Sequence, residues 1–380
     1  MIKSLMHVNR LAWIAVLLAL CVIAFGAFVR LSHAGLSCPD WPTCYGKATW
    51  PVHAHEIAHA NANFERPVET HKAWREQFHR HIAALLGVLV LTLAIVATRH
   101  RRYAKGIILG ASALVAVAIP LYMREWYVAS SVLVVTAELI LLGMAFRWDN
   151  RDFARAATLT LALIIFQAML GMWTVTWLLK PVVVMGHLLG GMATFAMLTW
   201  LAHRASPFAV IPNPPGLHVR GMLVVGIALV VVQIALGGWV SANYAALACG
   251  VDFPACQGQW WPRMNFSDAF VLWRGIGVDY EGGVLDADAR TAIQMVHRMF
   301  ALVVFGHVLA LAVRLIRDGR LPTYGWSIGF VLCLQVALGI TNVMAGLPLK
   351  VATAHNAFAA ILLFLLVGLL ARLRPAPVAA

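Results

Sequence analysis

The sequence predicts an all-helical protein that crosses a membrane several times and is built from two tandem repeats. Hydrophobic residues make up 61% of its 380 residues and charged residues only 12%, against about 45–50% and about 25% in soluble domains. Apolar runs long enough to cross ~30 Å of hydrocarbon recur along the chain. Short motifs of the first half return in the second. This composition excludes a soluble globular domain.

Ten membrane spans are expected. The first, residues 11–31, is too long for the apolar core of a signal peptide and is not followed by a small-residue cleavage site, so we interpret it as a span. The other nine are expected at residues 79–98, 106–122, 127–146, 156–178, 182–202, 220–241, 291–316, 323–345 and 351–371.

The formal net charge of +13 reflects basic residues that lie in short clusters between the apolar runs. This distribution favours the positive-inside rule over nucleic-acid binding. Every cluster falls on one side together with the N-terminus, which predicts a multi-pass protein of a bacterial inner membrane with both termini cytoplasmic. The two long loops, at about 32–78 and 242–290, then face outward. The clustered basic residues are Arg99, Arg101, Arg102, Lys105, Arg147, Arg151, Arg155, Arg204, Arg220, Arg314, Arg317, Arg320, Arg372 and Arg374.

An internal repeat defines the domain organisation. GAFVRLSHAGLSC at residue 26 resembles GGWVSANYAALAC at residue 237, EQFHRHIAAL at 76 resembles QMVHRMFALV at 294, and QAMLGMWTV at 167 resembles QVALGITNV at 335. The two HR motifs are 50 residues further apart than the two motifs that begin with glutamine. These 50 extra residues lie in the first half and contain the third and fourth spans. We therefore predict two four-helix bundles related by pseudo-twofold symmetry, residues 1–205 and 206–380, and an extra hairpin at about 103–150.

Four histidines lie in the outer halves of predicted spans and form two equivalent pairs, His79 with His187 and His297 with His355. Ionisable side chains at membrane depth are costly and usually functional. Facing histidines in a helical bundle suit the two axial positions of a haem iron, although a single one could serve only as an interhelical hydrogen-bonding group. Zinc fits less well, because neither pair has a nearby third ligand. The chain contains no CxxCH, so haem would be held non-covalently.

Two further sets of residues allow two interpretations each. Arg80 and Arg298 follow the first histidine of each pair and would either contact haem propionates or extend to lipid headgroups. A group of histidines in the first outer loop could bind a metal or could simply be solvated; it comprises His53, His55, His59 and His71.

The two halves differ near the first histidine. Glu76 lies three residues before His79, on the same helix face, whereas Gln294 occupies the equivalent position before His297. A carboxyl group near a porphyrin can donate or accept a proton and a glutamine cannot, although Glu76 could instead orient an imidazole. Arg30 likewise corresponds to Ser241. These differences predict a reactive site in the first half and an electron-transfer site in the second.

Each outer loop carries a pair of cysteines, Cys38 with Cys44 and Cys249 with Cys256. The outer side of a bacterial membrane is oxidising, so we expect each pair to form a disulfide. A structural bond and a redox-active bond both remain open.

Several of these motifs together resemble haem A synthase, the family that matures the haem of cytochrome oxidases. They are RLSHAGLSCPDWPTC, the ExxHR at Glu76 to Arg80, LGMWTVTWLLKPVVVMGHLLGG around His187 and the HR at His297. The resemblance covers nearly the whole chain outside the extra hairpin, to which it assigns no role. It implies that haem O is the substrate, whose C8 methyl group undergoes two hydroxylations to a gem-diol that loses water, giving the formyl group of haem A.

The resemblance also implies residue roles. His79 and His187 would bracket the substrate haem with Glu76 assisting, and His297 and His355 would ligate a resident haem B that relays electrons. The Cys38–Cys44 pair would belong to the functional outer loop. Expected partners are membrane lipid, the enzyme that makes haem O and cytochrome oxidase assembly factors.

Two other functions are compatible with duplicated helical bundles. A di-haem b-type cytochrome exchanging electrons with quinone needs the same four histidines, but it would not need Glu76 on one side only. A haem or ion transporter is the third class. The spans lack the matched Gly/Pro interruptions near mid-membrane that would indicate one.

Overall fold

The computed structural model describes residues 2–149, 153–206, 210–211 and 217–373, with twelve helices in these ranges. Ten of them are long and apolar enough to cross a membrane, so the predicted all-helical membrane fold is confirmed. The ten are α1 (Ile2–Leu31), α3 (Thr70–Ala97), α4 (Ala104–Met123), α5 (Tyr127–Phe146), α6 (Phe153–Thr176), α7 (Pro181–Arg204), α8 (Leu217–Ala242), α10 (Ala287–Asp318), α11 (Pro322–Met344) and α12 (Leu349–Arg372). Two short helices in the outer loops, α2 (Ala54–Asn63) and α9 (Phe266–Ala269), were not expected from the sequence.

Local signals set the helix ends. Pro181 and Pro322 occupy the first turns of α7 and α11, where the missing N–H group of proline costs no hydrogen bond. The side chain of Asp286 accepts a hydrogen bond from the N–H of Ala289 at the start of α10 (2.7 Å). Helix α10 ends at Asp318 and is followed by Gly319, whose φ of 70° is easily adopted by glycine.

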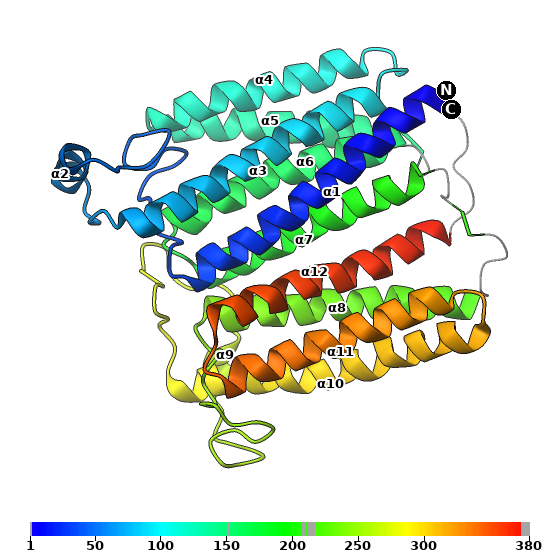
Figure 1. Ribbon diagram of the computed structural model, residues 1–380. Coiled ribbons are helices and arrows are strands. Elements are labelled where there is room, and N and C mark those ends of the chain that lie inside the picture. The colour runs from blue at the N-terminus through cyan, green and yellow to red at the C-terminus, as the bar shows by residue number, and fades with distance from the viewer. Residues whose placement is uncertain (1, 150–152, 207–209, 212–216, 374–380) are drawn as a thin grey trace.

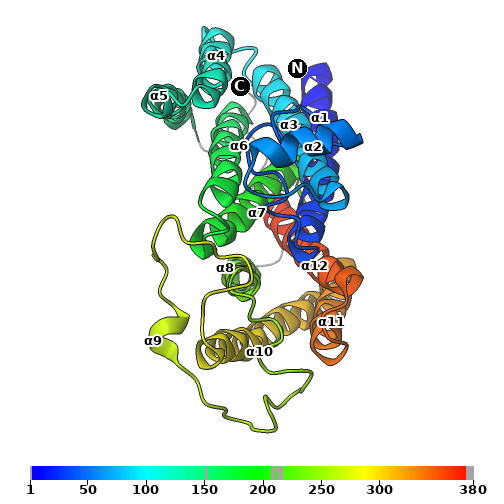
Figure 2. The same ribbon diagram turned by 90° about the vertical axis from the view of Figure 1, so that its left-hand side faces the viewer.

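The helices run side by side, and the central helices α1, α7, α8 and α12 lie between two outer pairs (Figures 1 and 2). Helix α1 packs on α3, α7 and α12, while α8 packs on α10, α12 and α7. The outer pairs are α3 with α6 and α10 with α11. Exchanging α1 with α8, α3 with α10, α6 with α11 and α7 with α12 reproduces these contacts. The packing therefore fits two repeats related by a pseudo-twofold axis.

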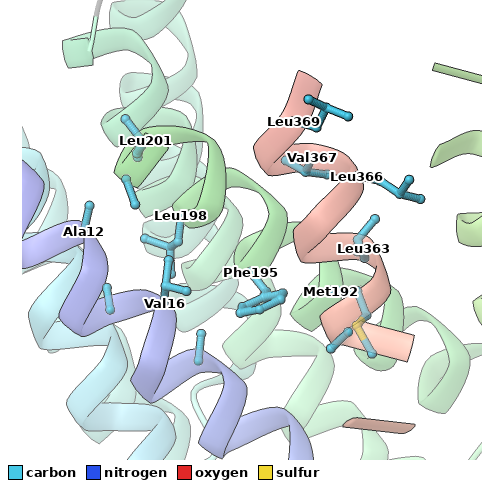
Figure 3. Close-up of a cluster of buried hydrophobic side chains, with 14 of the residues drawn as sticks. Ala12, Val16, Met192, Phe195, Leu198, Leu201, Leu363, Leu366, Val367 and Leu369 are labelled. Atoms are coloured by element: carbon cyan, nitrogen blue, oxygen red, sulfur yellow. The ribbon is translucent and has the colours of Figure 1, made fainter. Parts of the chain in front are cut away.

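A buried apolar cluster joins the central helices away from the long loops (Figure 3). Phe195 and Leu198 of α7 pack between Val16 of α1 and Leu363 of α12, all of them nearly inaccessible to solvent. Burying a side chain of this size contributes about 1.5–3 kcal/mol in water, whereas in lipid the gain comes from close packing.

The extra hairpin consists of α4 and α5, which pack on each other and mainly on α6 (Figure 1). Ser130 donates a 2.9 Å hydrogen bond from Oγ to the carbonyl of Ala118 and sets the register of the two helices. The start of α1 and the end of α12 lie at the same end of the bundle, opposite the long loops that carry α2 and α9 (Figure 1). An even number of spans requires this arrangement.

Candidate functional site

All four predicted histidines line one continuous cavity of about 2190 Å³ whose walls come from both halves of the chain. His79 lies on α3 and His187 on α7, whereas His297 lies on α10 and His355 on α12. The structure thus brings the members of both predicted pairs to one cavity. The cavity is large enough for more than one porphyrin-sized ligand, and its lining is mainly apolar.

A glycine on a neighbouring helix faces each histidine ring. A Cβ atom added to Gly26 would lie 2.8 Å from Cε1 of His79, and one added to Gly171 would lie 3.0 Å from Cε1 of His187. In the second half, the corresponding distances are 3.2 and 3.0 Å, for Gly237 and Gly339. The rings therefore lie directly against neighbouring helices, at positions that a side chain would fill. Paired imidazoles held in this way beside an apolar cavity fit the axial ligands of haem.

Glutamine amides contact three of the four histidines. Gln167 places Nε2 3.0 Å from Nδ1 of His187 and donates to that residue's carbonyl (2.6 Å). Gln233 does the same at His297, at 3.2 and 3.1 Å. At His355, the side-chain Nε2 of Gln335 lies 3.3 Å from Nε2 of the ring. The backbone carbonyl oxygen of Gln335 lies 3.1 Å from Nδ1 of the same ring.

In the sequence, Gln167 and Gln335 stood out only as part of the repeat, and Gln233 was missed. The signal that would have found all three is the motif QxxLG, which occurs at Gln167, Gln233 and Gln335. In each case, the glutamine and the glycine lie one helical turn apart and face the same imidazole.

Glu76 is buried and joins helix α3 to the first cysteine loop. Its Oε2 accepts hydrogen bonds from the backbone N–H of Cys38 (2.8 Å) and the hydroxyl of Ser37 (3.0 Å), and its Oε1 pairs with Arg80 (2.6 Å). The carboxylate also borders the histidine cavity. It is therefore held by charge-assisted bonds beside the first pair of histidines.

The arginines that follow the first histidines bind loop carbonyls. Arg80 donates to the carbonyls of Asp40 (2.7 Å) and Thr43 (2.6 Å), and Arg298 donates to those of Asp252 (3.1 Å) and Ala255 (3.0 Å). Both guanidinium groups thus hold an outer loop against a helix. These contacts were not expected from the sequence, and a bond to a propionate remains a prediction.

Both expected disulfides are present, Cys38–Cys44 and Cys249–Cys256, with Cα–Cα distances of 4.7 and 4.6 Å. The two loops differ in how they are tied to the membrane helices. In the second half, the side-chain oxygen Oε1 of Gln294 is buried without a hydrogen-bond partner among the described residues. The carboxylate link made by Glu76 is thus specific to the first half.

The two halves also meet at the outer end of the bundle. Arg30 donates to the carbonyl of Ser241 (2.7 Å) and to the hydroxyl of Tyr244 (2.9 Å). From the second outer loop, Trp273 covers the buried ammonium group of Lys180, whose Nζ lies 3.4 Å from the centroid of a ring of this indole. The second loop therefore closes over the outer end of the first half.

The extra hairpin forms one wall of the cavity. Glu138 of α5 and Ser112 of α4 border it, and each has a buried oxygen without a hydrogen-bond partner among the described residues. Glu138 was not among the functional residues expected from the sequence. An acidic residue inside an apolar span is itself the signal that indicates a functional position.

The first outer loop is folded rather than extended. Burial raises the pKa of Tyr45 to about 12, an effect that the negative charge of Glu76 reinforces, and Tyr45 donates to the carbonyl of Pro67 (3.1 Å). The imidazoles of His53 and His55 stack with centroids 5.8 Å apart. In the part of the chain that the structure describes, no three His, Cys, Asp or Glu side chains are grouped to hold a metal ion.

Fold and site together define a helical membrane protein in which two histidine pairs share one cavity. The family described as cytochrome oxidase assembly protein matches residues 9–120 and 121–367. A heme A synthase of Shewanella oneidensis is 36% identical over 364 residues, which cover 95% of each chain. One of Sphingopyxis alaskensis is 26% identical over 380 residues, covering 96% of this chain and 91% of the relative. The chain belongs to the cytochrome oxidase assembly protein family.

Proposed function

We propose that this protein is a haem A synthase, a membrane oxidoreductase that converts haem O into haem A by oxidising a porphyrin methyl group to a formyl group. Membership of the family and the names of its relatives support the activity. The observation that carries the proposal is the cavity shared by the two histidine pairs, in which the carboxylate of Glu76 stands beside the first pair and the amide of Gln294 holds the equivalent position beside the second.

The first half would bind the substrate and the second half a resident cofactor. His79 and His187 are the proposed ligands of the haem O iron, and His297 and His355 those of haem B. When bound, haem B would supply a one-electron relay for the oxidation. Arg80 and Arg298 stand near the outer end of each site, where they would contact propionates in addition to the loop carbonyls.

Glu76 is the proposed catalytic residue. Its carboxylate is fixed by the N–H of Cys38, the hydroxyl of Ser37 and the guanidinium of Arg80. A base held in one orientation beside the substrate can take up the proton released from the oxidised carbon, which typically contributes 10²–10⁴-fold to a rate. The cysteine loop would hold this base in place, whether its disulfide is structural or redox-active.

The membrane orientation follows the basic clusters. We propose a bacterial inner-membrane protein whose termini are cytoplasmic and whose disulfide loops face the periplasm, in keeping with the oxidising environment that disulfides need. Both haems would then lie near the outer face. The enzyme that makes haem O and cytochrome oxidase assembly factors are the proposed partners, since substrate and product are both membrane-bound.

Haem analysis tests the proposal directly. The protein is expressed in cells that make haem O, purified, and its extracted haems are separated by chromatography. We expect haem A in the wild type, and Glu76→Gln should lower its yield at least about 100-fold while the second-half haem stays bound. The matched control is Gln294→Ala, which alters the equivalent position of the second half and should leave haem A present.

The alternative of a di-haem cytochrome makes the opposite prediction. Two haem B groups of unmodified porphyrin, in a wild-type protein supplied with haem O, would overturn the proposed synthase activity. Retention of the second-half haem in Glu76→Gln separates a lost reaction from a lost fold.

A further inference from the structure

One of the four histidines lacks the glutamine that contacts the other three. Nδ1 of His79 is buried and has no hydrogen-bond partner among the described residues. Ring nitrogens of His187, His297 and His355 all lie within 3.3 Å of a glutamine amide. His79 belongs to the half that we propose to bind the substrate.

The sequence explains the difference. The helix that faces each histidine carries QxxLG in three cases, beginning at Gln167, Gln233 and Gln335. The fourth facing helix, α1, reads VIAFG from Val22 to Gly26. Gly26 faces the ring of His79 as the other glycines face theirs, since a Cβ added at each would lie within 3.2 Å of the ring. Val22 therefore stands where the repeat has Gln233. Both residues line the cavity.

A glutamine beside a ligating imidazole restrains the ring. Such a contact restrains the orientation of the ring, and the loss of polar partners that hold a ligating histidine typically costs about 10–100-fold in metal affinity. Gln167 and Gln233 also bind the backbone of the histidine they face, which anchors each amide. In the second half, both ligands are restrained, whereas in the first half only His187 is.

We propose that Val22 makes His79 the releasable ligand of the first-half haem, so that this half exchanges haem while the second half retains it. The inference rests on the proposed function and deepens it, since an enzyme whose substrate and product are both haem must release one before binding the next. Val22 is a positioning residue, because it acts through His79. Its apolar side chain leaves the imidazole without the hydrogen bond that a glutamine at this position would make.

Mirrored substitutions provide the test. The purified protein, loaded with haem B in both sites, is mixed with excess apomyoglobin, and haem transfer is followed by absorbance. We expect two phases, of which the faster is absent in His79→Ala. Val22→Gln should slow the faster phase about tenfold, and Gln233→Val should accelerate the slower phase by a similar factor. Val22→Met, which matches glutamine in length but has no amide, is the control for volume and should leave the faster phase unchanged.

The outcomes separate this inference from the proposed function. If Val22→Gln and Val22→Met slow the faster phase equally, or if neither changes it while His79→Ala removes it, the role of Val22 is wrong and the haem ligands stand. If neither His79→Ala nor His297→Ala removes a haem, the proposed ligands themselves fail. Because Gln233→Val tests the same bond at a second site, misfolding of Val22→Gln alone would not leave the inference untested.

Discussion

Arg30 donates a 2.7 Å hydrogen bond to the carbonyl oxygen of Ser241, the residue that holds its own position in the second half of the chain. A contact between two equivalent positions lies where a pseudo-twofold axis passes. The guanidinium group also lies 4.3 Å from the ring centroid of Tyr244 and donates to its hydroxyl. One side chain of the first half thus spans the axis at the outer end of the bundle.

Arg30→Ala should therefore weaken the joint between the halves. Hydrogen bonds to a charged group contribute about 1.5–3 kcal/mol each, so we expect a clear fall in the thermal midpoint of the purified protein. Tyr244→Phe keeps the aromatic ring and removes a single bond, and it should cause a smaller fall. An unchanged midpoint in Arg30→Ala would show that the halves are held together elsewhere.

The first cysteine loop should depend on its arginine more than the second loop does. Arg80 pairs with Glu76 in addition to binding loop carbonyls. Arg298 binds two loop carbonyls and lies 5.9 Å from the ring centroid of Phe253, with no ion pair among the described residues. Removing one partner of a buried ion pair typically costs about 3–5 kcal/mol. Arg80→Ala should therefore expose Cys38–Cys44 to reductant.

The measurement is the rate at which each disulfide is reduced and alkylated, read by mass spectrometry. We expect Arg80→Ala to accelerate reduction of its own loop at least tenfold, and Arg298→Ala to accelerate Cys249–Cys256 by less. Equal effects of the two variants would mean that the ion pair with Glu76 contributes nothing to the loop.

The spans and the cysteine pairing could be predicted because each depends on signals that are local in sequence. Apolar runs set the helices, and α5 was predicted at its observed bounds. Helix α3 begins nine residues before its predicted span, since a helix can extend beyond the hydrocarbon into polar sequence. Hydropathy therefore predicts the part of a helix that lies in the hydrocarbon and does not predict where the helix begins or ends.

The contacts of Arg80 could not be predicted, because they depend on how a loop folds back on a helix 40 residues away. Position in the sequence placed the guanidinium near the outer surface, where haem propionates and lipid headgroups were the expected partners. The contacts with loop carbonyls come in addition to these untested expectations. Val22 was missed for a different reason, since an apolar residue in an apolar span stands out only against the three glutamines of the repeat.

The glycines that face the histidines should tolerate no side chain. Gly26→Ala would bring a methyl group to 2.8 Å from the ring of His79, and overpacking of this kind costs about 1–3 kcal/mol. We expect haem binding in the first half to weaken about tenfold, measured by haem titration of the purified apoprotein. Gly110→Ala on α4 is the control, because an added Cβ there has no neighbour within 4 Å and Gly110 is not among the residues that border the cavity. Equal affinities of the two variants would contradict close contact at Gly26.

The fold of the first outer loop should be sensitive to acid below about pH 4. A hydrogen bond from Lys47, followed by the N–H groups of Val52 and His53, lowers the pKa of Glu56 to about 2, against about 4.3 in an unfolded chain. Because the folded pKa is the lower one, the carboxylate stabilises the loop fully above about pH 4.3. This contribution is lost as the pH falls toward 2. We expect pepsin to cleave α2 slowly at pH 4 and much faster near pH 2.

Glu56→Gln isolates this carboxylate from the other acidic groups of the loop. The variant cannot lose a proton, so its α2 should be cleaved readily at both pH values once each rate is normalised to that of an unfolded reference peptide. Lys47→Met retains the carboxylate and its two backbone bonds but removes the largest cause of the low pKa, so its transition should move toward pH 4. A wild-type transition that coincides with that of Lys47→Met would show that the lysine does not hold the carboxylate in its ionised form.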